Sequence, residues 1–484
     1  MEFELKVNRT NGKVTDMIYG QFIEHILNCI EGGVYDPKSS LADAEGIRTD
    51  VLKKAKELNP PILRFPGGTV MCQYHWEDGV GPKSERIKRK NLIWGGELDL
   101  SFGTAEFVSF CRRIGAEPMI CVNMVSGTPE EAANWVEYCN GTGQSYYAQL
   151  RRSHGYEEPF GVKYWCIGNE SYAEPDLGVH HDVSLYVRDA LEFIKFMKLT
   201  DRSIKTILVG CDKPEWNKAV LDALHPFCDY LSLHHYSAEN GKGLYGPFEG
   251  EKALIQMIEE ASDLIDTYPE TIENFNPWFR FPPRSGKIKI ALDEWNIWNF
   301  TPDETYGLLA EYNWRDAVWV ASAMNDIIRH PAVSIANMAQ LVNVIAPIVT
   351  TPNGSYYQTI AYPFLLYRKN MIGDRVDAEM TPVCFDGKEA GEIEALSYSV
   401  VRQADGTLCI AVVNRNFSQS YTIHVGTGEG TMTTLTASSP YGCCSPRNCC
   451  VQEVSATVSL DEITLEAGSV NLIFCTKASI DKEA

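Results

Sequence analysis

The sequence of 484 residues has no uninterrupted apolar run that approaches the 18 residues of a membrane-spanning helix. It is also short of positive charge, since 43 Lys and Arg stand against 64 Asp and Glu, a formal net charge of −21. A surface this acidic repels phosphate backbones and anionic lipids, so we expect neither a nucleic-acid nor a membrane partner. The segment Met1–Val7 alternates like a strand and lacks the apolar core of a signal peptide. We therefore expect a cytoplasmic protein.

Composition excludes the other non-globular classes. Hydrophobic residues make up 44% and charged residues 22% of the chain, which is typical of a protein with a full core. A disordered, fibrous or collagen-like chain is excluded. The length allows about three ordinary domains, or one large α/β barrel and a smaller domain.

The chain has fifteen cysteines, which we expect to be reduced thiols, most of them inside apolar segments. Four of them form two adjacent pairs, Cys443-Cys444 and Cys449-Cys450, in a stretch typical of a loop. Such pairs suit a soft metal, a redox disulfide or simply a cysteine-rich surface turn. Because neither pair has the CxxC spacing of a metal finger, we expect no metal there.

Between residues 18 and 340, short β-rich apolar runs alternate with longer segments of helical periodicity. In Glu106–Ile114, for example, the apolar residues recur at i, i+3, i+4 and i+7. Eight strands alternating with helices predict a closed parallel (β/α)8 TIM barrel. An open doubly wound sheet is the alternative, but no GxGxxG motif follows the first strand. The predicted strands are Ile18–Phe22, Ile62–Phe65, Met119–Asn123, Lys163–Gly168, Ile207–Gly210, Tyr230–His234, Ile288–Leu292 and Val333–Met338.

The pattern changes after about residue 371, where helical periodicity gives way to short strands separated by Gly and Ser turns. This predicts a C-terminal antiparallel β-sandwich domain. We expect three segments: an N-terminal strand segment, 1–17, that pairs with the sandwich, the catalytic barrel, 18–371, and the sandwich, 372–484. The predicted strands of the sandwich are Glu394–Val401, Thr407–Asn414, Tyr421–Val425, Thr431–Thr436, Val454–Leu460 and Ser469–Thr476.

Reactive groups of such a barrel lie where its strands end, at the C-terminal face. The fourth predicted strand ends in Asn169 and Glu170, and the seventh is followed by Asp293 and Glu294. Paired carboxylates among aromatic and amide side chains are what glycoside hydrolysis requires: one protonates the leaving oxygen and the other attacks the anomeric carbon or activates water. The sequence therefore predicts a glycoside hydrolase. A non-catalytic sugar-binding protein is a distant alternative, because a binder has no need of both carboxylates.

Six motifs, in order along the chain, surround these strand ends: Gly20–His25, Arg64–Gly68, Tyr74–Pro82, Asn134–Asn140, Tyr164–Glu170 and Asp293–Asn296. They are similar to the motifs of glycoside hydrolase family 51, the α-L-arabinofuranosidases, and the similarity is weakest after residue 380. The resemblance implies a (β/α)8 barrel with a C-terminal β-sandwich. It also implies an exo-acting retaining enzyme that releases terminal α-L-arabinofuranosyl residues from oligosaccharides or glycosides, and a homo-oligomer such as a hexamer.

The resemblance also implies roles for individual residues. Glu170 matches the general acid/base and Glu294 the nucleophile of a double displacement. We expect Glu170 to have a raised pKa, because it must hold a proton beside an ionised Glu294. The residues that match sugar-binding positions are Glu24, Gly68, Thr69, Trp94, Asn169, Tyr236 and Gln358. No cofactor and no metal are implied.

The sequence departs from the family pattern at two places. Thr69 and Val70 replace an Asn and an aromatic residue, and His75 replaces an Asn. Because Thr69 follows a Gly-Gly loop that approaches the sugar, a second furanose such as apiose or galactofuranose is the alternative substrate. Two histidine pairs, His180-His181 and His234-His235, also resemble metal ligands. Adjacent residues of a strand point to opposite faces, so we expect no metal at the second pair, and we expect a solvated turn at the first.

Overall fold

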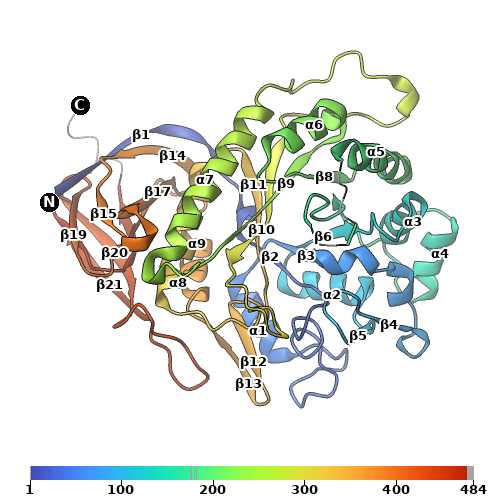
Figure 1. Ribbon diagram of the computed structural model, residues 1–484, viewed down its shortest axis with the longest axis horizontal. Coiled ribbons are helices and arrows are strands. Elements are labelled where there is room, and N and C mark those ends of the chain that lie inside the picture. Colours follow the sequence, from blue (N-terminus) through green and yellow to red (C-terminus); the bar gives the residue numbers. More distant parts are fainter. Residues whose placement is uncertain (1, 175–176, 179, 181, 477–484) are drawn as a thin grey trace.

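The structure is a computed structural model that describes residues 2–174, 177–178, 180 and 182–476. Its centre is a closed parallel barrel of eight strands in the order β10-β11-β2-β3-β6-β7-β8-β9 (Figure 1). The predicted (β/α)8 TIM barrel is therefore confirmed. The barrel strands are β2 Gly20–Phe22, β3 Ile62–Phe65, β6 Glu117–Val122, β7 Tyr164–Ile167, β8 Lys205–Val209, β9 Tyr230–Ser237, β10 Lys289–Ile297 and β11 Val333–Met338.

Two barrel strands are longer than the apolar pattern predicts. β9 continues past His234 to Ser237, and β10 continues past Leu292 to Ile297. The two extensions pair with each other in the same ladder: Glu294 lies opposite His234, and Asn296 lies opposite Tyr236. The ladder has an irregularity between Ala291 and Glu294, and pairing resumes at Glu294, so this side chain stands on paired strand backbone.

Helices surround the barrel and bury one apolar face each. In α2 the predicted apolar residues are buried, and the helix ends at Gly115, whose φ of +81° is a left-handed cap that favours glycine. α8 differs because nearly all of its side chains are buried, as it packs against both the barrel and strands β17 and β18. The α-helices are α1 Thr49–Leu58, α2 Thr104–Ile114, α3 Pro129–Asn140, α4 Tyr146–Ser153, α5 Val183–Thr200, α6 Pro214–Leu224, α7 Gly246–Ile265, α8 Trp314–Arg329 and α9 Ala361–Asn370.

The C-terminal strands lie beside the barrel in a mostly antiparallel sheet with the order β21-β20-β23-β18-β17-β14-β1-β19-β22 (Figure 1). Ile410 of β18 and Ile463 of the last strand, β22, are five strands apart in this order and share one buried core, so the sheet forms two layers as the predicted sandwich does. β1 is antiparallel to β14 and parallel to β19. These strands are β1 Glu2–Val14, β14 Gly373–Met380, β17 Leu396–Arg402, β18 Leu408–Asn414, β19 Tyr421–His424, β20 Glu429–Thr436, β21 Gln452–Ser459, β22 Ile463–Leu465 and β23 Val470–Cys475.

Short 3-10 helices and two-stranded hairpins lie in the connections between the main strands and helices. The 3-10 helices include η2 Thr69–Gln73, which begins directly after the Gly-Gly loop of β3. None of the helices in the described part of the chain combines the length and the apolar character needed to cross a bilayer. The three hairpins outside the two main sheets are β4 Lys88–Lys90 with β5 Glu97–Asp99, β12 Ile348–Thr351 with β13 Gly354–Tyr357, and β15 Cys384–Asp386 with β16 Glu392–Glu394.

The general expectation of reduced thiols does not hold for two of the four clustered cysteines, for which a disulfide was one of the alternatives. Cys444 and Cys449 are joined by a disulfide, whereas thirteen cysteines are free. An isolated antiparallel bridge places these two residues opposite each other with their Cα atoms 4.0 Å apart, which is close enough for the bond. Cys443 and Cys450 remain free and half-buried on either side of it.

Candidate active site

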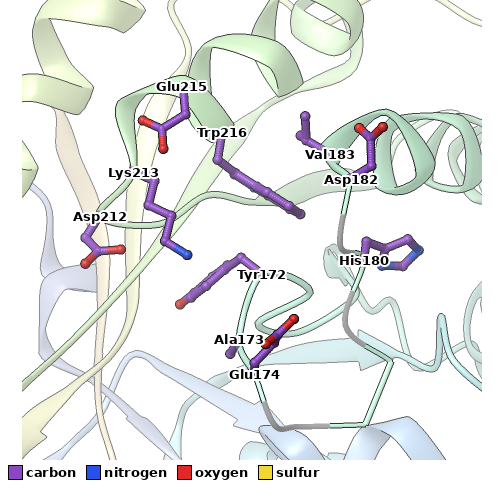
Figure 2. Close-up of a pocket in the computed structure, with 10 residues that line it drawn as sticks. All are labelled: Tyr172, Ala173, Glu174, His180, Asp182, Val183, Asp212, Lys213, Glu215 and Trp216. Atoms are coloured by element: carbon purple, nitrogen blue, oxygen red, sulfur yellow. The ribbon is translucent and has the colours of Figure 1, made fainter.

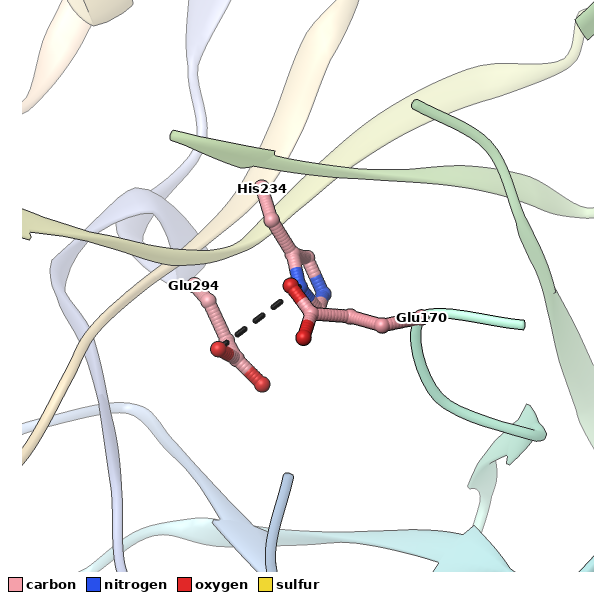
Figure 3. A group of neighbouring side chains, drawn as sticks. All are labelled: Glu170, His234 and Glu294. Carbon is pink, nitrogen blue, oxygen red and sulfur yellow. Dashed lines mark hydrogen bonds and ion pairs between the residues drawn. The ribbon is translucent and has the colours of Figure 1, made fainter. Parts of the chain in front are cut away.

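Two carboxylates meet at the C-terminal mouth of the barrel. Glu294 stands on β10, and Glu170 follows β7 in a loop where its own φ is +42°. Ligand atoms of Glu170, His234 and Glu294 all lie within 4.8 Å of one another (Figure 3). A glutamate held in the left-handed region is uncommon, and such strain concentrates at functional sites. The two residues predicted from the strand ends are thus neighbours in space.

Glu294 is held from two directions. The Nη1 atom of Arg64 donates to its Oε1 at 2.5 Å, and the Tyr236 hydroxyl donates to its Oε2 at 2.8 Å. The guanidinium of Arg64 also donates to Asn169 Oδ1 at 2.7 Å and forms an ion pair with Asp293 at 3.2 Å. Because Arg64 is fully buried in β3, its rigid guanidinium holds these three partners around itself. The Glu294 carboxylate is therefore oriented before any ligand binds.

Glu170 shares a hydrogen bond with a histidine. The Nδ1 atom of His234 lies 2.9 Å from Glu170 Oε1 and 3.6 Å from Glu294 Oε2, and the Tyr172 hydroxyl lies 3.4 Å from Glu170 Oε1. Burial opposes ionisation of Glu170, but the hydrogen bond and charge of His234, assisted by Arg64, outweigh it and lower the pKa of Glu170. The expectation of a raised pKa is wrong for the unliganded site, because it took no account of His234.

The surroundings of His234 favour its protonated form. Burial lowers the pKa of its imidazole, but the charge of Glu294 and the hydrogen bonds to Asp293 and Glu170 raise that pKa well above its usual value. Its Nε2 atom lies 3.4 Å from Asp293 Oδ1, which also accepts from Ser232 at 2.6 Å. Asp293 thus steadies the far side of the imidazole while Nδ1 faces the two glutamates.

A third carboxylate, Glu24, lies on the other side of Glu294. It accepts hydrogen bonds from the backbone N–H of Val70 at 3.1 Å, from Trp94 Nε1 at 3.2 Å and from Gln340 Nε2 at 2.8 Å. Burial, followed by the negative charge of Glu294, raises the pKa of Glu24 to about 7. Its protonation state therefore changes near neutral pH.

The Gly-Gly loop after β3 separates these two carboxylates. A Cβ atom on Gly68 would lie 3.0 Å from Glu294 Oε1 and 3.5 Å from Glu24 Oε2. Glycine is needed here because any side chain would occupy the space between the carboxylates. The buried Thr69 follows Gly68 at the start of η2.

The structure brings Glu24, Gly68, Trp94, Asn169 and Tyr236 to this cluster with the two glutamates, as described above. Gln358 is placed elsewhere. Its amide accepts from the backbone of Tyr312 and donates to the carbonyls of Ala310 and Ala346, so its polar atoms have backbone partners.

Four residues that hold the site received no role in it from the sequence: Arg64, His234 and Asp293, which were named only as parts of motifs, strand ends or pairs, and Gln340. The sequence signal for Arg64 is its place inside an apolar strand. A buried guanidinium needs carboxylate partners, so such an arginine indicates carboxylates close to it. Gln340 is the amide that directly follows β11, the eighth barrel strand, so the strand-end rule pointed to it rather than to Gln358.

The residues that depart from the family pattern make other contacts. His75 pairs through Nδ1 with Glu131 at 3.0 Å and through Nε2 with Ser126 at 3.2 Å. Val70 contributes only its backbone N–H to Glu24. The side chain of His75 is therefore engaged by the loops of β6 and α3, whereas Thr69 stays next to the Gly-Gly loop.

Glu170, His234 and Glu294 are the described residues whose ligand atoms are close enough together to hold a metal ion. Arg64 forms an ion pair with Glu294, and the raised pKa of His234 favours a second positive charge beside these carboxylates. His235 turns to the other side of β9, where its Nε2 contacts Ser237 at 3.0 Å. Of the other histidine pair, His180 lies 3.4 Å from Asp189 and His181 lies outside the described residues.

Comparison with known proteins identifies the family. Residues 54–253 match the model of the "Alpha-L-arabinofuranosidase 1 domain" and residues 293–482 that of the "Alpha-L-arabinofuranosidase C-terminal domain". A probable α-L-arabinofuranosidase C of Aspergillus flavus is 37% identical over 89% of this chain and 88% of its own length. An intracellular exo-α-(1→5)-L-arabinofuranosidase of Halalkalibacterium halodurans is 35% identical over 84% of this chain and 83% of its own.

A solved structure agrees over the whole fold. The GH51 α-L-arabinofuranosidase of Thermotoga petrophila superimposes with a TM-score of 0.86 at 34% identity, over 98% of this chain and 100% of the other. The barrel, the paired carboxylates at its mouth and these relatives lead to one conclusion. The chain is a glycoside hydrolase and belongs to the α-L-arabinofuranosidases of glycoside hydrolase family 51.

Proposed function

We propose that this enzyme removes terminal α-L-arabinofuranosyl residues from oligosaccharides or glycosides with retention of configuration. The observation that carries the mechanism is the short separation of the carboxylates, since oxygens of Glu170 and Glu294 lie within 4.8 Å. Retaining glycosidases place their carboxyl groups about 5–5.5 Å apart, whereas inverting ones leave about 6.5–9.5 Å for a water molecule. The arabinofuranosyl specificity is supported by the names of the relatives.

In this proposal Glu294 is the nucleophile. Its carboxylate attacks the anomeric carbon, the glycosidic bond breaks, and a covalent furanosyl ester forms on Glu294. Arg64 and Tyr236 each direct a hydrogen to one of its oxygens, which fixes the angle of attack. A carboxylate that is oriented in advance loses little entropy when it reacts.

Glu170 is the proposed general acid, and His234 supplies its proton. The raised pKa of His234 and the lowered pKa of Glu170 favour the proton on His234, and in this proposal a transfer along their 2.9 Å hydrogen bond makes Glu170 a neutral acid. As the bond to the leaving group breaks, Glu170 gives this proton to the departing oxygen. The pair then consists of a neutral imidazole and an ionised carboxylate.

The same pair serves the second displacement. Once Glu294 is esterified it no longer carries the charge that most strongly raises the pKa of His234, so the imidazole stays neutral. Glu170 then acts as the base and takes a proton from the water that attacks the ester. The release of ionised Glu294 raises the pKa of His234 again, and the proton returns to the imidazole. The cycle ends in its starting state.

The sugar that is released occupies the side of Glu294 that faces Glu24. Glu24 and Asn169 are the groups placed to bind its hydroxyls, and the Trp94 indole forms a wall that bonds directly to Glu24. This bond closes the far end of the site, which supports an exo action on terminal residues. The Halalkalibacterium halodurans relative, named as an intracellular exo-acting enzyme, supports the same action and a location inside the cell.

Trapping the intermediate tests the nucleophile. A 2-fluoro-arabinofuranosyl fluoride should label the wild-type protein at Glu294 by mass spectrometry, and proton NMR should show the α-anomer as the first product. Label on any other residue, or a first product of the β-configuration, would contradict the mechanism.

The dependence of kcat/KM on the leaving group tests Glu170 as the general acid. Glu170→Ala should lower kcat/KM by about 10²–10⁴-fold on an arabinobioside but far less on nitrophenyl arabinofuranoside, whose phenolate needs no proton. Equal losses on both substrates would remove Glu170 from this role. Nitrophenyl β-D-apiofuranoside, measured beside these substrates, tests whether Thr69 widens the choice of furanose.

We further propose that the enzyme assembles as a homo-oligomer, such as a hexamer, which the family resemblance supports. Light scattering after size-exclusion chromatography measures the mass directly. A monomeric mass at working concentration would contradict the proposal.

A further inference from the structure

Four cysteines lie close together in the connection between β20 and β21, and none of them takes part in the glycosidase chemistry. We refer to residues 440–450 as the cysteine hairpin. Its turn is closed by Ser445, whose backbone N–H donates to the carbonyl of Asn448 at 2.6 Å. Just before and after this turn, Cys444 and Cys449 lie opposite each other in an antiparallel bridge and are joined by the disulfide.

The next residues on the two sides of the hairpin, Cys443 and Cys450, are a second opposed pair. In an antiparallel ladder, the register that sets Cys444 opposite Cys449 also sets Cys443 opposite Cys450. A Cβ atom on Gly442 would lie 2.9 Å from Cys450 Cβ and 3.2 Å from its Sγ, so Cys450 does lie against this side of the hairpin. Opposed residues have Cα atoms about 4.5–5.5 Å apart, within the about 4.4–6.8 Å that a disulfide spans.

The thiols of this second pair are accessible to small reagents. Ten of the thirteen free cysteines are buried, whereas Cys443 and Cys450 are half-buried and Cys384 is exposed. Burial, followed by the charge of Glu311, raises the pKa of Cys443 to about 11, and burial raises the pKa of Cys450. Because the thiolate is the nucleophile, both thiols react slowly at neutral pH and faster in mildly alkaline solution.

The cysteine hairpin is docked on the start of α8. Cys443 forms an isolated antiparallel bridge with Asn313, the cap residue of this helix. The backbone N–H of Trp314 donates to the carbonyl of Gly442 at 2.9 Å, and the N–H of the next residue donates to the carbonyl of Pro440 at 2.8 Å. The first N–H groups of a helix have no partner inside it, so the hairpin supplies their acceptors. A bond that fixes the hairpin therefore also holds the first turn of α8.

We propose that Cys443 and Cys450 are a redox site that reacts with a low-molecular-weight disulfide, such as oxidised glutathione, and closes a second cross-strand disulfide that holds the hairpin on α8. One cysteine thiolate attacks a sulfur of the oxidant, which forms a mixed disulfide and releases one thiol. The other cysteine thiolate attacks the protein sulfur of that mixed disulfide, so the Cys443–Cys450 bond forms and the second thiol leaves. The protein gives up two protons and two electrons, and the oxidant takes them up as two thiols.

The redox site and the active site are built from different elements. The catalytic residues stand at the ends of the barrel strands, and the cavity of about 890 Å³ next to Tyr172 is lined by the loop after β7 and by the segment between β8 and α6 (Figure 2). We therefore expect oxidation to leave kcat/KM on nitrophenyl arabinofuranoside unchanged. Unchanged activity also verifies that the oxidised enzyme is folded.

Peptide mapping tests the second disulfide, because trypsin cuts after Arg447, in the exposed turn between the two halves of each pair. The enzyme is incubated with oxidised glutathione at mildly alkaline pH, then denatured, alkylated and digested without reduction. The Cys444–Cys449 bond keeps the two peptides joined. Before oxidation we expect alkyl groups on Cys443 and Cys450 of this joined product, and after oxidation we expect the loss of both.

Single variants show whether the two cysteines react with each other. In Cys443→Ser or Cys450→Ser the remaining thiol has no partner, so it should keep one glutathione as a mixed disulfide. Cys384→Ser removes the exposed thiol of β15 and is the matched control, which should still form the second disulfide. Wild-type protein that keeps glutathione or free thiols on Cys443 and Cys450, forms disulfide-linked dimers, or binds stoichiometric zinc through its reduced cysteines would overturn the proposal.

Hydrogen exchange tests the link to α8. The amides of Trp314 and of the residue after it should exchange more slowly in the oxidised protein than in the protein with one disulfide, because their acceptors lie on the hairpin. The first amides of α2, which begins at Thr104, are the internal control and should not change. Equal exchange at the start of α8 in both states would show that the second disulfide does not hold the helix.

Discussion

His234 points its Nδ1 at Glu170 Oε1 across 2.9 Å, and this contact determines where the site keeps its proton. An ionised carboxylate has no hydrogen to give, so the imidazole is the donor. The resulting pair carries a single proton that either member can hold, and it titrates as a unit. A histidine in this position therefore affects the acid step although it need not touch the substrate.

Replacement of His234 by Gln should change the pH profile more than the fold. Glutamine still donates to Glu170 but carries no titratable proton. In the wild type, kcat/KM should fall at basic pH when the His234–Glu170 pair loses its proton. Because the pKa of His234 is raised, we expect this fall above pH 6.5. In the variant Glu170 must hold the proton alone, so we expect the basic limb to move to lower pH. The measurement is kcat/KM against pH on an arabinobioside, and His424→Gln in the C-terminal sheet is the control. An unchanged basic limb would show that His234 only positions Glu170.

Gly68→Ala should lower activity without unfolding the protein. The expected effect depends on the space beside Gly68. The new Cβ would lie 3.0 Å from Glu294 Oε1 and must displace it. Misplacement of a reacting group by a fraction of an ångström to 1 Å costs about 10²-fold, and we expect that loss in kcat/KM on the nitrophenyl substrate. Gly354→Ala in β13, where a Cβ meets open space, is the control. Full activity of Gly68→Ala would mean that the loop relaxes away.

Glu24→Gln should stabilise the protein at alkaline pH. The pKa of Glu24 rises from 4.5 to about 7 on folding, so between these values the native state binds more protons than the unfolded state. The stability that Glu24 contributes is therefore complete below pH 4.5 and is lost as the pH rises through 7. The loss amounts to about 3 kcal/mol at 1.36 kcal/mol per pKa unit. Because glutamine does not ionise, the melting temperature of the variant relative to wild type should be higher at pH 8 than at pH 5. The same difference at both pH values would contradict the raised pKa; Glu130→Gln, exposed on α3, is the control.

The fold was largely predictable because its signals are local. Eight apolar runs gave the barrel, and the loss of helical periodicity after residue 371 gave the C-terminal strands. β14 was missed because Gly373–Met380 alternates weakly and carries charged residues, and it becomes a strand by pairing with β1, more than 350 positions away. A pairing between strands so far apart in the sequence cannot be recognised from the local residue pattern.

The site was predictable in its two glutamates and less so in what surrounds them. Strand ends located Glu170 and Glu294, since a barrel brings its C-terminal edge together. The lowered pKa of Glu170 depends on His234, which is 64 positions away and becomes its neighbour only in the barrel. The family resemblance predicted Gln358 as a sugar-binding residue, but the amide that donates a hydrogen bond to Glu24 belongs to Gln340. Distances of this kind require coordinates.

Arg64 allows the effect of charge to be separated from that of geometry. Its guanidinium contacts Glu294, Asn169 and Asp293 from three separate nitrogen atoms of a rigid fork, a geometry that the compact ammonium of lysine does not have. Arg64→Lys keeps the charge, so we expect a folded protein whose kcat/KM falls about 10²-fold because Glu294 is no longer oriented.

Arg64→Met also removes the charge and leaves Asp293 buried without its main partner, which costs about 3–5 kcal/mol of stability. Thermal unfolding and kcat/KM on the nitrophenyl substrate, measured on both variants, separate the two effects. Arg188→Lys on the exposed surface of α5 is the control for the substitution itself. If Arg64→Lys retained wild-type activity, charge alone would orient Glu294, the proposed nucleophile, and the three-way contact would serve only stability.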